Sequence, residues 1–155
     1  MKLITHLVGA VVIILAVLAY AAPIGPMPGF VIGGTPTAAP DTWPNTTDVH
    51  EIKLKVPGTL PRVVIIWVIQ QQGELHVVGS PDSGWVKQLG NGGPVEMRLG
   101  DQTYPLNAER LTADTDSIIT AYVDKYRPDY PDIVADFPAP EDAAGNFALF
   151  RLNRS

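Results

Sequence analysis

The chain has 155 residues, no cysteine and a formal net charge of −5 at pH 7. The lack of cysteine excludes disulfides, thiolate nucleophiles and thiolate metal sites. The acidic balance comes without any cluster of lysine and arginine, so the composition also argues against a nucleic acid partner. Once the apolar start and the proline-rich stretch after it are set aside, about 110 residues remain, which is enough for one folded domain.

Residues 1–22 form an apolar segment whose only charged side chain is Lys2. The twenty residues from Leu3 onward would span roughly 30 Å as a helix, the thickness of a bilayer's hydrocarbon core. No lysine or arginine follows Lys2 before Lys53, so the positive-inside rule places the rest of the chain outside the cytoplasm. The small-x-small run Ala19-Tyr20-Ala21 also fits a cleaved signal peptide. The sequence predicts export, with a retained transmembrane anchor favoured over secretion after cleavage.

Residues 23–44 are rich in Pro, Gly, Ala and Thr, and six of them are prolines. Such a segment buries too little apolar surface to fold independently, and its prolines favour extended backbone. We therefore expect a tether at 23–44, in which Phe30-Val31-Ile32 would dock on the domain or on a membrane. The folded domain is expected at 45–155.

From residue 52 onward the apolar pattern takes the period of β-strands. Residues 52–56 alternate with lysines, which predicts a strand with one wet face. Residues 63–69 form a continuous apolar run rich in β-branched side chains, typical of a strand covered on both faces. A hairpin at 70–73 then leads to a partner strand at 75–78.

The second half of the domain continues this alternation. Turn residues at 91–94 precede a strand at 95–99, and the next strand, at 103–111, contains Pro105, which favours an edge position or a bulge. Apolar residues at helical spacing predict a helix that ends before Arg127-Pro128. A last strand at 147–152 follows a loose acidic stretch. Six short strands with one or two short helices predict a mainly β fold, a six-stranded antiparallel barrel.

The stretch from Gly79 to Leu89 combines hydroxyls, glycines, an indole and an ammonium group. Glycines let the backbone approach a phosphate, and a short helix starting near Ser83 would aim free N–H groups at it, while Lys87 would supply charge. Trp85 would cover a ring. Taken alone, the stretch is better explained as a strand, a turn and one helical turn whose Trp fills the core.

Other chemistries have weaker support. His50 and His76 are the only histidines of the domain, and Glu74 with His76 gives two ligands without a third, so no metal site is predicted. A triad of Ser83, His76 and Asp82 lacks a nucleophile elbow. There is no P-loop or dinucleotide fingerprint, and no catalytic residue is assigned.

Several short runs occur in the order of a known superfamily. They are Pro61-Arg62-Val63, Trp67, Gly73 to Val77, Ser83 to Lys87, Val95 to Gly100, Tyr104, and Ala121 to Tyr126. In this order the chain resembles the flavin- and deazaflavin-binding split-barrel superfamily, the pyridoxamine 5′-phosphate oxidase-like fold, over roughly residues 48–127. It looks most similar to small members in which a Trp followed by a basic residue begins the phosphate-side helix.

This resemblance implies a homodimer of split barrels with FMN or a deazaflavin bound between subunits. The positions that match the superfamily's cofactor-binding residues are Arg62, Trp67, Ser80, Ser83, Trp85 and Lys87. Gln88-Leu89 stands where many relatives have Asn-Leu. Ordinary structural roles remain open: both tryptophans suit a core, Lys87 a solvated helix face and Arg98 a cross-strand ion pair.

Two functions of different class follow. In the first, the chain is an exported, membrane-tethered flavin- or deazaflavin-dependent oxidoreductase, in which the ring carries the electrons and the protein supplies orientation and charge. In the second, it is a non-catalytic split-barrel domain that binds a ligand or a partner at the membrane.

Overall fold

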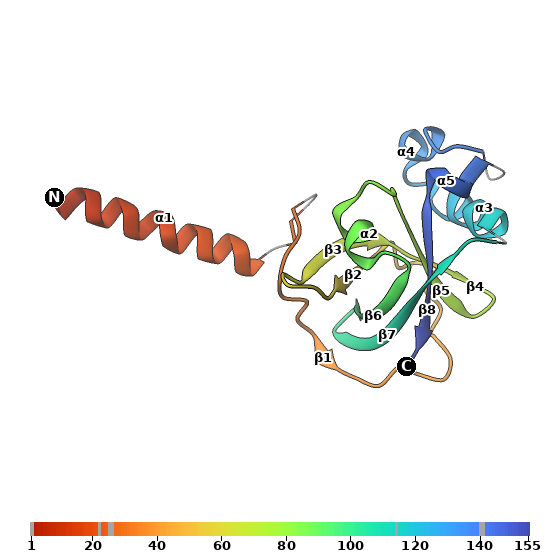
Figure 1. The fold of residues 1–155 in the computed structure, drawn as a ribbon, viewed down its shortest axis with the longest axis horizontal. Helices are drawn as coiled ribbons and strands as arrows, with labels where there is room; N and C mark the ends of the chain where they lie inside the picture. Colours follow the sequence, from red (N-terminus) through yellow and green to blue (C-terminus); the bar gives the residue numbers. More distant parts are fainter. Residues whose placement is uncertain (1, 22, 25–26, 114, 140–141) are drawn as a thin grey trace.

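The computed structural model describes residues 2–21, 23–24, 27–113, 115–139 and 142–155 (Figure 1). Ala22 and Pro26, which belong to the predicted N-terminal segments, lie outside these ranges. The elements in chain order are α1 (Lys2–Ala21), β1 (Thr35–Pro36), β2 (Glu51–Val56), β3 (Arg62–Trp67), β4 (Ile69–Gln71), β5 (Glu74–Gly79), α2 (Gly84–Leu89), β6 (Gly92–Leu99), β7 (Gln102–Leu111), α3 (Thr115–Tyr126), α4 (Pro131–Ala135), α5 (Ala143–Asn146) and β8 (Ala148–Arg154).

The strands form one curved sheet in the order β3-β2-β6-β7-β8-β5-β4. All neighbours along this path are antiparallel, and β1 adds a short parallel pairing to β7. The two outermost strands, β3 and β4, are consecutive in the chain, so the sheet curls until its ends meet through the backbone at Val68. The expected mainly β, antiparallel split barrel is therefore confirmed.

The predicted number of six strands is wrong, because the described residues form eight. One extra strand arises because the expected strand at 63–69 breaks at Val68. The amide of Val68 donates to Tyr126 Oη at 2.9 Å, and its carbonyl accepts from Lys125 Nζ at 2.8 Å. Since side chains of α3 satisfy both backbone groups, β3 ends there and β4 begins with new partners. The other extra strand, β1, comes from the predicted tether.

Pro105 lies inside β7 without disturbing its ladders. On one edge of β7 the pairing with β1 ends at Thr103, and the pairing with β8 begins at Leu106. Pro105 falls between the two, where its missing N–H costs nothing.

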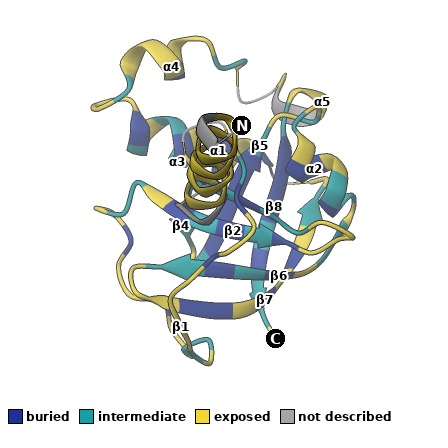
Figure 2. Ribbon diagram, turned by 90° about the vertical axis from the view of Figure 1, so that its left-hand side faces the viewer, coloured by how far each residue is buried: buried dark blue, intermediate teal, exposed yellow. Residues whose placement is uncertain are grey.

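The sheet separates two hydrophobic clusters. The larger fills the barrel, and includes Leu75, Val77 and Phe150. The smaller lies on the outer face beneath α3, and includes Val78 and Leu149. Alternate residues of β5 and β8 thus pack into opposite clusters. Most residues of both strands are therefore buried, and they are drawn in dark blue in Figure 2.

The proline-rich segment lies along the domain. Gly29 forms a bridge with Val63, and Trp43 is buried in the barrel cluster. Arg98 Nη1 donates to Ile32 O at 3.2 Å, and Thr103 Oγ1 donates to Gly33 O at 2.6 Å. Extended backbone, favoured by the prolines, leaves these carbonyls free for side chains of the sheet.

Helix α1 projects from the domain (Figure 1), and the side chains of residues 4–18 are exposed. The sequence predicts a transmembrane anchor or a signal peptide here. Among the helices of the described residues, none combines the length and hydropathy that a membrane span requires.

Residues 129–146, expected to be loose, contain two short helices, α4 and α5. Val134 is buried in the outer cluster, and Phe137 packs there with its ring 5.1 Å from that of Phe147. Aromatic contacts therefore hold this acidic segment against α3.

Candidate functional site

Helix α2 and the loop before it form a compact corner of the barrel. Ser83 is the N-cap, and its hydroxyl donates to Ser80 O at 2.8 Å instead of capping the helix. The amide of Asp82 donates to Ser80 Oγ at 3.3 Å. The two serines predicted to bind a phosphate thus shape the loop in this structure. We call Arg62 together with residues 80–87 the α2 corner.

Two cationic side chains reach this corner. A Cβ added at Gly84 would lie 2.9 Å from the guanidinium carbon of Arg62, so the guanidinium of Arg62 packs against the first residue of α2. Lys87 Nζ lies 3.1 Å from Asp82 Oδ1, and the two side chains are 62% and 94% exposed. An ion pair this exposed contributes at most about 1 kcal/mol, so Lys87 can exchange Asp82 for an anionic ligand at little cost.

Trp85 faces inward and anchors α2. It is 6% exposed, and its ring centre lies 5.6 Å from that of Phe150. A Cβ at Gly79 would collide with the indole, so the glycine makes room for the ring. A ligand on the surface would meet the backbone above Trp85 rather than the face of its indole.

Gln88 fixes the position of α2. Its Nε2 lies 3.1, 3.1 and 3.2 Å from the carbonyls of Val56, Pro57 and Leu60. The side chain reaches the loop between β2 and β3, which carries Arg62 at its end. Gln88 thus ties α2 to the loop that precedes Arg62.

Trp67 does not belong to the α2 corner. It lies five residues after Arg62, about 17 Å further along the extended strand β3. Its ring stacks on Tyr126 with centres 4.1 Å apart and an angle of 8° between the planes, and Tyr130 adds a contact at 4.9 Å. Of the six predicted residues, the structure brings together Arg62, Ser80, Ser83, Trp85 and Lys87, and places Trp67 in the outer cluster.

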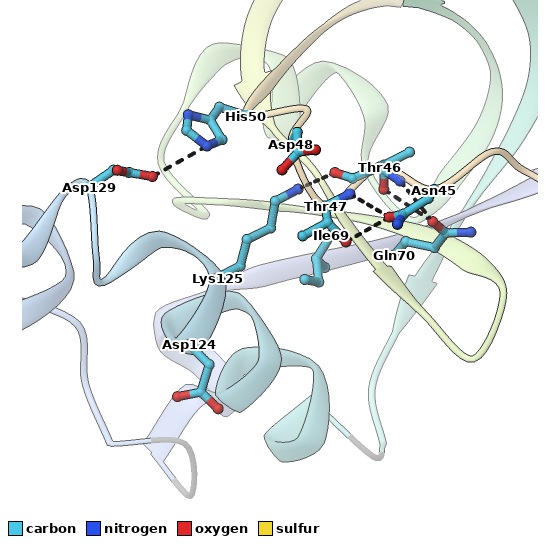
Figure 3. Close-up of a pocket in the computed structure, with 10 residues that line it drawn as sticks. All are labelled: Asn45, Thr46, Thr47, Asp48, His50, Ile69, Gln70, Asp124, Lys125 and Asp129. Atoms are coloured by element: carbon cyan, nitrogen blue, oxygen red, sulfur yellow. Dashed lines mark hydrogen bonds and ion pairs between the residues drawn. The ribbon is translucent and has the colours of Figure 1, made fainter.

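A cavity of about 580 Å³, which no sequence pattern indicated, lies beside this aromatic cluster (Figure 3). Polar side chains from residues 45–50, β4, α3 and the segment after α3 line it. Lys125 enters from α3, and its Nζ donates to the carbonyls of Thr46, Val49 and Val68 at 2.9, 2.8 and 2.8 Å. Burial lowers the pKa of Lys125, and the charge of Asp48 opposes this effect.

One further side-chain contact spans this cavity. His50 Nε2 lies 3.3 Å from Asp129 Oδ2, as the dashed line in Figure 3 shows. All three donors of Lys125 are used by the backbone, so the ammonium group binds the fold together and is not free for an anionic ligand. No group of three metal-ligating side chains occurs in the part of the chain that is described.

Taken together, the topology and the position of α2 define a split-barrel fold. The sequence matches no family model and no curated protein. Among solved structures, the heme storage protein HutZ from Vibrio cholerae superimposes with a TM-score of 0.51 at 14% identity, over 70% of this chain and 84% of HutZ. This likeness shows the fold.

Two further solved structures are similar at lower scores. One is a NimC/NimA family protein from Clostridium acetobutylicum, with 20% identity and a TM-score of 0.48 over 66% of this chain and 73% of that one. The other is the FAD and heme binding protein from Mycobacterium smegmatis, with 15% identity and a TM-score of 0.48 over 70% of this chain and 62% of that one.

Proposed function

We propose that the domain binds a flat, conjugated cofactor with an anionic end, of the flavin or heme type. The observation that carries this proposal is the split-barrel fold, which is also the fold of HutZ, a heme storage protein. The sequence resemblance to the flavin- and deazaflavin-binding superfamily supports the same class of ligand.

The α2 corner supplies the charge that such a ligand requires. Arg62 and Lys87 bring two cations to one end of the barrel of an otherwise acidic chain. Because Lys87 is held only by an exposed ion pair with Asp82, a phosphate or carboxylate competes well for it. We assign the anionic end of the cofactor to this corner.

With a flavin or deazaflavin, the domain would work as an oxidoreductase in which the ring accepts and donates electrons or hydride. The chain would contribute binding, orientation and charge. The second candidate is a domain that holds its ligand without turnover, which the printed role of HutZ as a storage protein favours. The homodimer implied by the superfamily is part of the proposal, and light scattering at known concentration measures it.

We further propose that the domain is exported, as its N-terminal sequence predicts. The apolar side chains of α1 are exposed in the structure. A contiguous apolar surface of this kind is unfavourable in water, which supports its role as an export segment that contacts an apolar environment. Fractionation of the native host provides the test, and recovery of the protein in the cytosol would contradict export.

The cofactor proposal is tested by the visible absorption of the full chain purified from its native host, followed by titration with FMN, a deazaflavin and hemin. We expect one of them to bind. Arg62→Ala and Lys87→Ala should each weaken binding about tenfold or more, since a charge-assisted hydrogen bond contributes about 1.5–3 kcal/mol. Lys53→Ala, on the wet face of β2, is the matched control. A colourless chain that binds none of the three would refute the proposal.

A further inference from the structure

Exposed apolar side chains gather on the side of the domain from which α1 projects (Figure 1). Outside α1, six large apolar side chains of the described residues are exposed, namely Ile24, Met27, Phe30, Val31, Leu60 and Ile133. The first four belong to the segment that follows α1, and Leu60 lies in the loop between β2 and β3. We call these five residues the apolar patch. Single exposed apolar residues are common on proteins, whereas a group of them marks an interaction site.

The bridge between Gly29 and Val63 brings the two parts of the apolar patch together. These residues exchange both backbone hydrogen bonds, each at 2.8 Å, in an antiparallel arrangement. Phe30 directly follows Gly29, and Leu60 precedes Val63 by three residues, which is about 10 Å of chain at most. Side chains that are distant in sequence therefore become neighbours around this bridge.

Both parts of the apolar patch are held by side chains of the barrel. The carbonyl of Leu60 accepts from Gln88 Nε2 at 3.2 Å, and the side chain of Leu60 is 70% exposed. In the run Phe30-Val31-Ile32 only Ile32 is buried, and its carbonyl accepts from Arg98 Nη1 at 3.2 Å. The exposure of Phe30 and Val31 is thus built into a segment that is docked on the domain.

Only a short stretch of chain connects the apolar patch to α1. This helix ends at Ala21, and Gly29, eight residues later, is already bridged to Val63. Eight residues span at most about 29 Å when fully extended. Ile24 and Met27 exchange backbone hydrogen bonds at 3.1 Å within this stretch, which shortens its reach. Whatever surface α1 associates with therefore lies close to the apolar patch.

We propose that the apolar patch docks on the surface of a lipid bilayer, so that the domain lies against the membrane. The inference rests on the proposed role of α1 as an export segment in an apolar environment, and it does not depend on the cofactor. Aromatic and aliphatic side chains such as Phe30 and Leu60 insert at the boundary between lipid headgroups and acyl chains. Since Arg62 follows Leu60 by two residues, docking also brings the α2 corner near the headgroups.

The short connection favours a bilayer over a protein as the occupant. A bilayer that holds α1 brings its own surface within reach of the apolar patch. A second copy of the chain or another protein would have to fit between that surface and the domain. The net charge of −5 argues against attraction to anionic lipids, so the proposed contact is apolar and neutral phosphatidylcholine is the appropriate probe.

The test measures how deeply Leu60 lies in a bilayer. The chain has no cysteine, so Leu60→Cys provides a single site for an environment-sensitive fluorophore. The labelled full chain is reconstituted into phosphatidylcholine vesicles with and without brominated acyl chains. Ile133→Cys is the matched control, because Ile133 is also an exposed apolar residue but belongs to α4. We expect brominated lipid to quench the label at residue 60 several-fold more strongly than the label at residue 133.

Replacing Phe30 and Val31 by Ser in the Leu60→Cys chain should lower the quenching to the level of the control. Both side chains are exposed, so the fold does not depend on them. Equal quenching at residues 60 and 133 in a chain that floats with the vesicles would overturn the docking and leave the association of α1 intact. A blue shift at residue 60 without quenching would show that a protein covers the apolar patch, which also overturns it.

If the full chain does not float with the vesicles, the membrane association of α1 and this inference fail together. The titrations with FMN, a deazaflavin and hemin report separately on the cofactor proposal, so the failure of one proposal is distinguishable from the failure of the other.

Discussion

Lys125→Met should destabilise the fold, because this one ammonium group joins three separate segments. It connects α3 to the loop carrying Thr46 and Val49 and to the break at Val68. Methionine keeps the length and the apolar stem of the side chain, so the variant removes the hydrogen bonds with little loss of packing.

The magnitude follows from where the three carbonyls lie. Val68 is fully buried, and its carbonyl has one other donor within reach, Tyr126 Oη at 2.8 Å. That hydroxyl has a single hydrogen and lies closer to His50 O, at 2.6 Å. Leaving the Val68 carbonyl unpaired costs about 1–3 kcal/mol, and losing the other two bonds about 1 kcal/mol each. The ammonium no longer has to be partly buried, which offsets part of this loss, so we expect about 3 kcal/mol in total.

Urea unfolding of the full chain, followed by tryptophan fluorescence, measures this loss, since Trp67 stacks directly on Tyr126. Lys53→Met controls for the change of residue type. In a double-mutant cycle, Tyr126→Phe should couple with Lys125→Met by more than 0.5 kcal/mol, because both act on Val68. A Lys125→Met variant as stable as Lys53→Met would show that the three hydrogen bonds do not hold the segments together.

Three further outcomes follow from the geometry. Because burial holds the folded-state pKa of His76 below its usual 6.5, the unfolded chain takes up the proton first. Stability should therefore fall as pH drops from 6.5 toward the folded-state pKa, and His76→Phe should abolish this slope in pH-dependent urea unfolding. Gly79→Ala should cost about 1–3 kcal/mol by overpacking Trp85, measured by thermal unfolding; an unchanged melting temperature would contradict this. Lys87→Ala should change stability by less than about 1 kcal/mol, in contrast to its effect on ligand affinity.

Local sequence patterns predicted those strands and helices whose buried face can be recognised from the spacing of their own apolar residues. The alternation at 52–56 became β2, and the apolar face at 118–126 became the buried side of α3. The break at Val68 had no such signal. The residues around it are apolar and β-branched, and only the distant side chains Lys125 and Tyr126 end the strand. Periodicity alone predicts one long strand here, because it carries no information about tertiary contacts.

Tertiary contacts also explain why the proline-rich segment lies along the domain, although its composition predicted a tether. Arg98, Thr103 and Arg154 supply donors for its backbone carbonyls. Arg98 was expected in a cross-strand ion pair; its carboxylate partner is Asp101 in the adjoining turn, at 3.5 Å. Lys55 and Glu96 do form a cross-strand pair, at 2.6 Å.

The predicted residues of the α2 corner lie close together in the structure, whereas no sequence pattern indicated a pocket at the other end of β5. Ser80, Ser83 and Lys87 are close in sequence, so their proximity needs no knowledge of the fold. Three residues that line that pocket, Gln71, His76 and Arg151, come from three strands, and Arg151 is 75 residues beyond His76.

No sequence pattern assigned His76 a role beyond an incomplete pair of metal ligands with Glu74, and in the structure its side chain is buried. What distinguishes His76 is the arrangement of its neighbours. The register places a guanidinium on one side of the imidazole, and the tight turn between β4 and β5 places an amide on the other. Arg151 donates to Glu109 Oε2 at 2.7 Å and Gln71 donates to Ser117 O at 3.2 Å, so each side chain has a second contact besides its position in the register. Burial and the charge of Arg151 both lower the pKa of the imidazole, so its protonation depends on a strand that no local pattern connects to it.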